Sequence, residues 1–476
     1  MNASITKGFA AVLARVTAAP KKQFFFCLGV IAALLVAAFY LWGGWGAKPF
    51  AGYTLFSPLN SRTTYLINNE GAVVHQWASR HLPGISVYLL DNGHLLRATK
   101  SAPQGNRYFA AGGAGGGVEE LDWNGRVRWE YRYATERHRQ HHDIERLPNG
   151  NILMIAWERK SAAAAVAAGR DPELLKEGEL WPDHVIEVKP TSSGGEIVWQ
   201  WHLWDHLIQD RDPAKKNYGT VGAHPERVDI NFVGTMTGNP GVADWTHMNA
   251  VDYNAELDQI MLSVHGFNEI WVIDHSTTAA EAAGHRGGRY GKGGDILYRW
   301  GNPRAYRAGG PEDQQLFGQH DAKWIAKGLP GQDHILVFNN GLNRSGKGKG
   351  YSSVVEIKPP VDKRGGYSVG KERRYGPARP VWTYRAGISG GFYSAYISGA
   401  QRMPNGNTLI CNGYNGRFFE VTPRGKTVWS YINPFGTAAE NASTVIRKNG
   451  VFRAERYAAD HPAIRDKVLP GGDGRS

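Results

Sequence analysis

Asp244-Trp-Thr-His-Met-Asn-Ala-Val-Asp-Tyr253 is the stretch of sequence on which the fold depends. It is followed by Asp258-Gln-Ile-Met-Leu-Ser-Val-His265 and by Glu269-Ile-Trp-Val-Ile-Asp274. The pattern predicts a histidine at the start of one short strand, then a polar turn, an apolar strand, a second turn and a third strand. Similar units recur along the chain, so we expect a repetitive β structure.

Six of these units share one kind of ending. A hydrophobic run closes with two large rings two residues apart, which places both rings on one face of a strand. The six pairs are His75-Gln-Trp77, Trp129-Glu-Tyr131, Trp199-Gln-Trp201, Tyr298-Arg-Trp300, Trp382-Thr-Tyr384 and Trp429-Ser-Tyr431. Turns at Asp91-Asn-Gly-His94, Pro148-Asn-Gly-Asn151 and Pro404-Asn-Gly-Asn407 are hairpin signals, because Asn and Gly accept the positive φ that such turns require. Each unit therefore reads as about four antiparallel strands.

The repeat predicts an all-β fold, a six-bladed β-propeller whose blades are packed by the aromatic pairs. The expected blades cover residues 52–78, 84–133, 142–203, 247–302, 320–386 and 398–433. An irregular double sheet and a different number of blades are the alternatives. Between the blades, residues 161–168 and 172–177 are expected to be helical, and residues 204–246, 275–293 and 303–319 form long loops, where binding functions often lie.

Composition narrows the class of protein. With 476 residues, 42% of them hydrophobic, the chain is long enough to bury a large core. The net charge of +12 is compatible with binding to nucleic acid, to an anionic membrane surface or to anionic substrates. Lys and Arg are spread without a dense run, which argues against a nucleic-acid partner. The two cysteines, Cys27 and Cys411, are far apart in sequence, so no disulfide framework is expected.

The N-terminal part of the chain predicts a single-pass membrane anchor. Residues 1–23 are basic, and residues 24–42 contain no charge over a length that spans a bilayer. A cleaved signal peptide is the alternative, but the run is longer than a usual signal and ends without a small-residue cleavage site. The expected domains are a cytoplasmic basic segment at 1–23, a transmembrane helix at 24–42, a linker at 43–51, the propeller at 52–460 and a C-terminal tail at 461–476.

Three histidines occupy the same place in their units. They are His142, His247 and His320, and the equivalent positions in two other units hold Gly84 and Ser398. The innermost strands of a propeller line its channel, so we expect these imidazoles to converge near the axis, although any one alone is more often a structural residue. One interpretation is the handling of an anion, with proton exchange or nucleophilic attack. The other is a zinc site of three imidazoles.

Several motifs resemble those of one known family. They are Asp244-Trp-Thr-His-Met-Asn-Ala-Val251 with Ile260-Met-Leu-Ser263, Gly318-Gln-His-Asp-Ala322 with Val337-Phe-Asn-Asn-Gly341, Trp204-Asp-His-Leu-Ile-Gln209 and Val451-Phe-Arg-Ala-Glu-Arg-Tyr457. In these stretches the chain looks like the bacterial arylsulfotransferases, periplasmic six-bladed propellers that use no nucleotide sulfate donor. The likeness covers roughly residues 52–460. It implies a periplasmic propeller, and the predicted anchor at 24–42 would attach this propeller to the bacterial inner membrane.

The resemblance also implies a reaction and its residues. Family members move a sulfuryl group from a phenolic sulfate to another phenol by a ping-pong route through a sulfated histidine, without a metal redox cofactor, so no cofactor is expected. By this likeness His247 and His320 would hold the sulfuryl oxygens and manage the phenol proton, and Arg344 would balance the developing charge. Asn249 and His265 are further candidates for binding the substrate. The expected partners are an aryl sulfate, a phenol or a sulfated glycan, with a protein partner also open.

The sequence departs from the family pattern at two positions. The sulfated histidine of the family lies in the last blade, where the alignment places Arg417, here a candidate for binding substrate; a family arginine is replaced by Val264. Three alternatives follow: His142 is the nucleophile, transfer is direct between two bound substrates, or the protein is a binding or scaffold propeller without transferase activity. His141 and His206 are expected to be loop or supporting residues.

Overall fold

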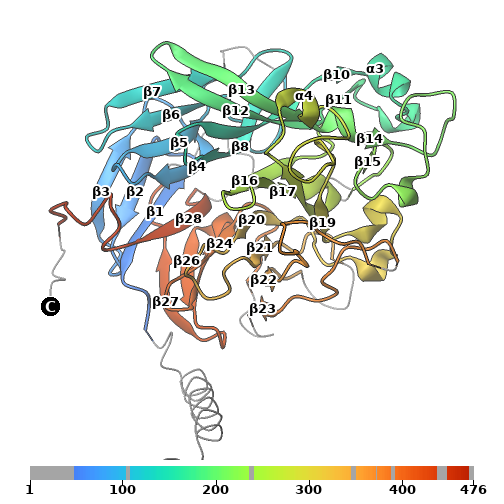
Figure 1. The fold of residues 1–476 in the computed structure, drawn as a ribbon. Helices are drawn as coiled ribbons and strands as arrows, with labels where there is room; N and C mark the ends of the chain where they lie inside the picture. Colours follow the sequence, from blue (N-terminus) through green and yellow to red (C-terminus); the bar gives the residue numbers. More distant parts are fainter. Residues whose placement is uncertain are drawn as a thin grey trace, which may run out of the picture.

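The protein is a six-bladed β-propeller, which confirms the predicted fold class. A computed structural model describes residues 48–102, 108–234, 241–344, 350–370, 372–386, 392–436 and 448–470. Within these residues six four-stranded antiparallel sheets surround a common axis (Figure 1). Residues 1–47, with the predicted anchor at 24–42, lie outside the described part. No helix of the described residues is long and apolar enough to cross a membrane.

The strands of each blade are given from the innermost, nearest the axis, to the outermost. Blade 1 contains β28 (Val451–Ala458), β1 (Gly52–Pro58), β2 (Thr63–Ile67) and β3 (Val73–Ala78), and blade 2 contains β4 (Pro83–Leu89), β5 (Leu95–Thr99), β6 (Gly117–Leu121) and β7 (Val127–Arg132). Blade 3 contains β8 (His138–Arg146), β9 (Ile152–Glu158), β12 (Asp183–Thr191) and β13 (Gly194–His202), and blade 4 contains β16 (Met248–Asn254), β17 (Gln259–Val264), β18 (Glu269–Asp274) and β19 (Tyr298–Trp300). Blade 5 contains β20 (His320–Trp324), β21 (Ile335–Asn339), β22 (Ser353–Ile357) and β23 (Trp382–Tyr384), and blade 6 contains β24 (Gly399–Arg402), β25 (Thr408–Asn412), β26 (Arg417–Val421) and β27 (Thr427–Ile432).

Blade 1 differs from the sequence prediction. Residues 52–78 supply only three of its strands, and the innermost strand is β28 from the C-terminal end of the chain. β28 pairs antiparallel with β1, with Tyr457 opposite Tyr53. The propeller is closed as a ring because its first and last strands, β1 and β28, pair in one sheet. A repeat count along the sequence does not reveal this pairing. Beyond β28, in the predicted tail, Ala463 and Ile464 are buried against the core of blade 1.

The outermost strands join each blade to the next around the whole ring. In every blade one ring of the aromatic pair forms a hydrogen bond to the following blade. Its partner lies in the turn or longer connection between the third and fourth strands of that blade. The contacts are His75 Nε2 with Trp123 O, Trp129 Nε1 with Gly194 O, Trp199 Nε1 with Thr277 Oγ1, Trp300 Nε1 with Pro377 O, Trp382 Nε1 with Pro423 O and Trp429 Nε1 with Asn69 O. The pairs therefore pack the blades, as tryptophans with a satisfied N–H do in buried positions.

Carboxylates join the innermost strands in the same direction. Asp143 Oδ2 accepts a hydrogen bond of 3.1 Å from the N–H of Val251 in the next blade. Asp252 Oδ2 accepts from Trp324 N–H at 2.6 Å, and Asp321 Oδ2 accepts from Ala400 N–H at 2.9 Å. These bonds fix how far each inner strand is displaced along the axis relative to its neighbour. They therefore set the level at which the first residues of the strands meet.

Short elements occupy the insertions between and within blades. The predicted helix at 161–168 is α3 (Ala162–Ala167), capped by the Ser161 hydroxyl, which accepts from Ala164 N–H. The predicted loop at 275–293 contains a further helix, α4 (Ala279–Ala282), with a capping box between Thr278 and Glu281. The other elements are β10 (Lys160–Ser161), β11 (Glu179–Leu180), β14 (Leu207–Ile208) and β15 (Val228–Asp229), with the 3-10 turns η1 (Pro172–Leu174), η2 (Leu203–His206), η3 (Val221–Ala223), η4 (His265–Phe267), η5 (Pro303–Tyr306), η6 (Pro311–Asp313) and η7 (Gly413–Asn415).

Candidate active site on the propeller axis

A repeated backbone kink brings the histidines together. In β8 His142 has a φ of 51°, directly before β16 His247 has a φ of 49°, and in β20 Asp321 has a φ of 52°. The pairing of β8, β16 and β20 with their second strands shifts at this same place. Such a bulge bends a strand and redirects its side chains. Left-handed φ values cost non-glycine residues about 1 kcal/mol each, so strain is concentrated at this ring of positions.

The structure brings four of the candidate histidines into one row. The ring centroids lie 4.6 Å apart between His142 and His247, 5.4 Å between His247 and His265, and 5.1 Å between His265 and His320. Phe452 of β28 closes the row, with its ring 5.9 Å from His142 and 6.2 Å from His320. All four histidines are more than nine-tenths buried.

His247 forms a pair with a carboxylate. Its Nδ1–H donates to Asp244 Oδ2 at 2.6 Å, which leaves the Nε2 lone pair as the reactive face of the neutral ring. No hydrogen bond to Nε2 is found among the described residues. Burial lowers the pKa of His247, but the charge and hydrogen bond of Asp244 outweigh burial and raise it above its usual value. The arrangement is that of an oriented nucleophile or base.

A second carboxylate orients His142 through another histidine. His141 donates from Nε2 to Asp183 Oδ1 at 2.6 Å, so its Nδ1 accepts from His142 Nδ1–H at 2.8 Å. Asp183 itself is held by Thr246 Oγ1–H and Met248 N–H through its Oδ2. This relay leaves the Nε2 lone pair of His142 free. Burial, and then the neighbouring His247, holds the pKa of His142 well below its usual value, so the ring is neutral.

Of the two members of this relay behind His142, His141 has the supporting role that is one of its two expected roles, whereas Asp183 has no signal in the sequence. Asp183 begins β12, the third strand of blade 3, and lies 42 residues from His141 in sequence. The only local signal was the doublet His141-His142, since two neighbouring residues of a regular strand face opposite sides and both approach one site only at a bulge.

His320 has both ring nitrogens engaged by the protein. Nδ1–H donates to Asn340 Oδ1 at 2.9 Å, and Nε2 accepts from Ile397 N–H at 3.1 Å. Burial lowers its pKa to about 3, so the ring is neutral. The neighbouring His265 has a buried Nδ1 without a hydrogen-bond partner, and burial followed by His320 lowers its pKa well below the usual value.

Arg344 and Asn249 carry unused polar atoms. The Arg344 guanidinium lies 4.7 Å from the ring of Phe317 and 4.4 Å from that of Tyr351, whose hydroxyl accepts from Nη1 at 3.0 Å. Its buried Nε and Nη2 have no hydrogen-bond partner within the described chain. Asn249 donates to Gln319 O at 2.8 Å, while its Oδ1 is buried and unpaired. Unpaired donors on a partly buried cation suit an anionic ligand.

Arg417 lies away from these contacts. It begins β26, the third strand of blade 6, and its Nε donates to Ser430 Oγ at 3.2 Å on the outermost strand. Its guanidinium packs 4.8 Å from the ring of Phe419, and no contact with the histidine row is found among the described residues. Blade 6 contains no histidine. In this blade η7 takes the place between second and third strands that η4, with His265, takes in blade 4.

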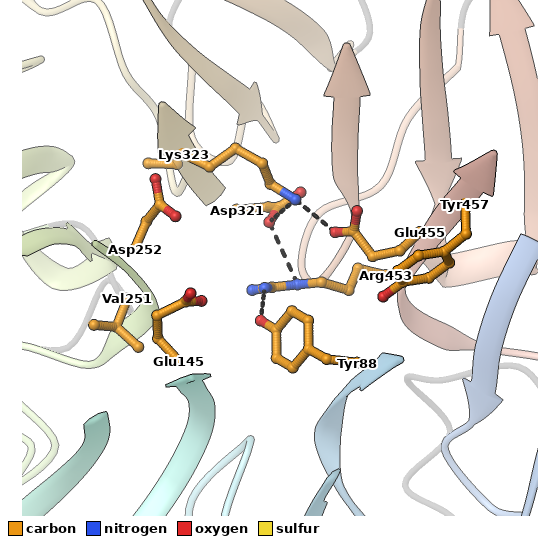
Figure 2. Close-up of a pocket in the computed structure, with 10 residues that line it drawn as sticks. Tyr88, Glu145, Val251, Asp252, Asp321, Lys323, Arg453, Glu455 and Tyr457 are labelled. Atoms are coloured by element: carbon orange, nitrogen blue, oxygen red, sulfur yellow. Dashed lines mark hydrogen bonds and ion pairs between the residues drawn. The ribbon is translucent and has the colours of Figure 1, made fainter. Parts of the chain in front are cut away.

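A charged cavity of about 130 Å³ is lined by residues of the innermost strands. Figure 2 shows Arg453 beside Asp321 and Tyr88, and Lys323 between Asp321 and Glu455. Glu145 and Asp252 face this cavity without a cation of their own. Burial is the main reason that the pKa of Asp252 rises to about 7 and that of Glu145 well above its usual value, and their mutual repulsion adds to the shift of Glu145.

The three-imidazole zinc hypothesis finds no support in this geometry. Among the described residues two groups of three potential ligands have their donor atoms within 4.8 Å of one another, and neither contains His142, His247 or His320. One group consists of His206, His285 and Asp295, and the other of His81, Glu119 and Glu130.

The fold and the site define a class: a six-bladed propeller with a buried, carboxylate-backed histidine row on its axis. The family model for arylsulfotransferases (ASST) matches residues 53–449, and the chain belongs to this family.

No curated protein matches the sequence. A protein of unknown function from Bacteroides caccae is similar in structure at 12% identity and a TM-score of 0.43, over 85% of this chain and 98% of that one. Virginiamycin B lyase from Staphylococcus aureus is similar at 10% identity and a TM-score of 0.36, over 82% and 86% of the two chains.

Proposed function

We propose that the protein transfers a sulfuryl group from an aryl sulfate to a phenol, with His247 as the nucleophile. Membership of the arylsulfotransferase family supports the reaction class. The observation that carries the assignment is the Asp244–His247 pair, whose Nε2 is free and whose ring lies 4.6 Å from that of His142. Because blade 6 has no histidine, the nucleophile must come from another blade.

In the first half-reaction Nε2 of His247 attacks the sulfur of the donor. The N–S bond forms as the bond between sulfur and the phenolic oxygen breaks, and the donor leaves as a phenolate. The sulfated ring carries a positive charge because Nδ1 keeps its proton. Asp244, 2.6 Å from Nδ1, stabilises that charge.

In the second half-reaction the acceptor phenol attacks the same sulfur. Nε2 of His142 takes the phenolic proton as the new O–S bond forms and the N–S bond breaks, which returns His247 to its neutral state. The lowered pKa of His142 keeps the ring unprotonated and ready to accept a proton. Once protonated, the ring is stabilised by the relay through His141 to Asp183.

Other candidates take binding or positioning roles in this proposal. Arg344 offers Nε and Nη2 to the sulfuryl oxygens. Phe452, packed with Tyr396 in one apolar cluster, provides a surface for the aryl ring beside the histidines. His320 is a positioning residue, because both of its nitrogens bind the protein and it holds the backbone at Ile397.

The test is transfer from 4-nitrophenyl sulfate to phenol by the full-length chain. We expect nitrophenolate release that depends on the acceptor, and labelling of the protein by radioactive sulfate donor in the absence of acceptor. His247→Ala is expected to abolish both. Labelling that persists in His247→Ala and is lost in His142→Ala would make His142 the nucleophile. No turnover and no labelling by the unaltered protein would support a binding propeller instead.

We also infer that residues 24–42 anchor the protein in the bacterial inner membrane, with the propeller in the periplasm. The support is the uncharged run of 19 residues preceded by a basic segment. Phosphatase fusions test the orientation: a reporter attached after residue 470 is expected to be active only outside the cytoplasm. An active cytoplasmic reporter at that position would contradict the inference.

A further inference from the structure

A second polar cluster lies on the insertions at blades 3 and 4. His206 ends η2, which follows blade 3, and His285 and Asp295 lie in the long connection between β18 and β19. Asp295 Oδ1 is 2.8 Å from His206 Nδ1 and 2.8 Å from His285 Nδ1. Two imidazole nitrogens and one carboxylate oxygen thus meet at one point, away from the histidine row.

The hydrogen bonds of His206 show why a positive ion is needed between its Nδ1 and the Asp295 carboxylate. Its Nε2 lies 2.9 Å from the carbonyl oxygen of Ala282, so Nε2 carries a proton and donates. In the neutral ring Nδ1 then has a lone pair, and this lone pair faces the Asp295 carboxylate. Two acceptors at hydrogen-bond distance are stable only if a proton or a metal ion lies between them. Metal-bound histidines commonly donate their other N–H to a backbone carbonyl in this way.

The surroundings of His206 are built to hold the ring in place. Trp201 stacks on it, with centroids 5.6 Å apart and planes at 6°, and donates its indole N–H to Gly294 O at 2.7 Å. A Cβ at Gly294 would lie 2.0 Å from Ala282 O and 2.7 Å from His206 Nε2. Only glycine therefore permits the close approach of Asp295, Ala282 and the buried ring.

Access to the cluster comes from the side of His285. The side chains of His206 and Asp295 are 0% and 6% exposed, whereas that of His285 is 41% exposed. A metal ion can enter past His285 and keep water as a further ligand. Ligands about 2.1 Å from one tetrahedral ion lie roughly 3.4 Å apart, so both 2.8 Å separations must open by about 0.6 Å. Both separations end on Asp295 Oδ1, so this carboxylate must move together with the exposed His285 ring.

We propose that His206, His285 and Asp295 bind a zinc ion that joins the insertion after blade 3 to the β18–β19 connection of blade 4. Two imidazoles and a single carboxylate suit zinc better than calcium or magnesium, which take oxygen ligands. The site is separate from the proposed transferase chemistry and does not depend on it.

The test is zinc binding by the full-length chain after treatment with a chelator. We expect one zinc ion per chain by metal analysis, and isothermal titration with ZnCl₂ is expected to show at least tenfold weaker binding in His285→Ala. The matched control is His224→Ala, which removes another exposed histidine, with a 45% exposed side chain, from the insertion after blade 3. This control is expected to bind zinc as the unaltered protein does.

Cobalt substitution gives a second measurement. Bound Co²⁺ is expected to show visible absorption bands of a tetrahedral site, which disappear or shift in His285→Ala. Zinc is also expected to raise the Tm of the unaltered protein and not that of His285→Ala. If no zinc binds, the cluster shares protons only. If binding is unchanged in His285→Ala but lost in His81→Ala or His247→Ala, the ion lies elsewhere. Either result overturns the proposal.

Discussion

Asp244 decides which nitrogen of His247 can react. Its carboxylate holds the Nδ1 proton, and its charge raises the pKa of the ring against the effect of burial. Below this raised pKa the ring is protonated on Nε2 and cannot attack sulfur. Transfer is therefore expected to rise with pH through a pKa above 6.5, the usual value for histidine.

Asp244→Asn removes the charge and keeps the size of the side chain. We expect kcat for sulfuryl transfer to fall by about 10²-fold or more, because the sulfated ring loses its counter-charge. The acid limb of the pH–rate profile is expected to move to lower pH, since the pKa of His247 falls. A profile whose acid limb stays in place would exclude His247 as the titrating group.

His141→Gln tests the relay behind His142. The glutamine amide cannot pass a proton between Asp183 and His142, so kcat is expected to fall about tenfold with the KM for the donor little changed. Labelling by the donor without acceptor is expected to persist, because the relay serves the second half-reaction. Equal loss in both half-reactions would assign His141 a purely structural role.

At this scale the sequence indicates the histidines of the row better than their hydrogen-bond partners. His142, His247 and His320 share one register, and that repeat was visible in the sequence. The carboxylate behind His141 has no such signal, because Asp183 reaches the site from a different strand of its blade. The use of both His320 nitrogens, one by a backbone N–H of blade 6, also has no local signal. Hydrogen-bond partners depend on which strands meet, and sequence spacing does not determine this.

At the scale of elements, the innermost strands place more carboxylates on the axis than cations. Glu145 on β8 and Asp252 on β16 lie on one side of the charged cavity and repel each other (Figure 2). Because the pKa of Asp252 is raised to about 7, the folded state holds a proton that the unfolded state releases at much lower pH. This pair therefore lowers stability as pH rises toward and through 7.

Glu145→Gln is expected to relieve this repulsion. The free energy of unfolding should increase by roughly 1–2 kcal/mol at pH 8 and change little at pH 5, where Asp252 is protonated. Urea denaturation at the two pH values measures the difference. Glu136→Gln, which removes the same charge from an exposed position, is the control and should show no such pH dependence. A loss of stability in Glu145→Gln at pH 8 would contradict the account.

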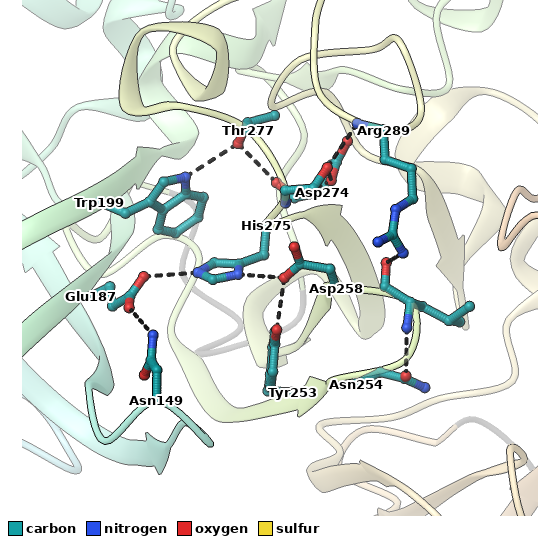
Figure 3. A network of polar contacts seen from close by, with 12 residues as sticks. Asn149, Glu187, Trp199, Tyr253, Asn254, Asp258, Asp274, His275, Thr277 and Arg289 are labelled. Carbon is teal, nitrogen blue, oxygen red and sulfur yellow. Dashed lines mark hydrogen bonds and ion pairs between the residues drawn. The ribbon is translucent and has the colours of Figure 1, made fainter.

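His275 joins the outer parts of blades 3 and 4. Figure 3 shows its ring between Glu187 of β12 and Asp258 of the turn before β17, with Nε2 3.0 Å from Glu187 and Nδ1 2.7 Å from Asp258. Both neighbours accept, so the charged ring fits best. Burial lowers the pKa of His275, but the two carboxylates outweigh burial and raise it.

The raised pKa gives His275 a definite pH dependence. Its contribution to stability is fully present below the unfolded pKa of about 6.5 and is lost as pH rises through the higher folded value. His275→Gln should therefore lower the free energy of unfolding by about 1–2 kcal/mol at pH 6 and by less at pH 9. His224→Gln, exposed and outside the blade interface, is the control. An equal loss at both pH values would show that the charge plays no part.

The elements themselves were largely predictable. Asn-Gly turns and period-two aromatic pairs indicated the hairpins and outer strands, because both signals are local. α4 was missed because it has four residues inside a glycine-rich stretch, and such a short helix is stabilised by its capping box rather than by apolar periodicity. The bulges at His142 and His247 were not predicted, since no glycine marks the positive φ there.

At the scale of the whole molecule, β28 closes the ring and links it across the axis. Arg453 pairs with Asp143 of blade 3 and Asp321 of blade 5, and Arg456 pairs with Glu420 of blade 6. These ion pairs are buried, and removing one side leaves uncompensated charge, which costs about 3–5 kcal/mol for a single pair. One C-terminal strand therefore links blade 1, to which it belongs, to blades 3, 5 and 6. Its Phe452 also lies beside His142 and His320.

Deletion of residues 451–476 is expected to abolish cooperative folding for this reason. β1 would become an open edge, Asp143 and Glu420 would lose their arginine partners, and Asp321 would keep only Lys323. Since Ala458 lies opposite Gly52 in the β1–β28 ladder, a short glycine-rich turn can join them in a circular permutant that begins at Gly125 and ends at Asn124. Both positions lie in the hairpin turn between β6 and β7. Thermal unfolding followed by circular dichroism is expected to show a single transition for the permutant and none for the truncated chain. A truncated chain with a native-like transition would mean that the blades are held by the outer tryptophan contacts alone, and that closure by β28 serves the active site rather than the fold.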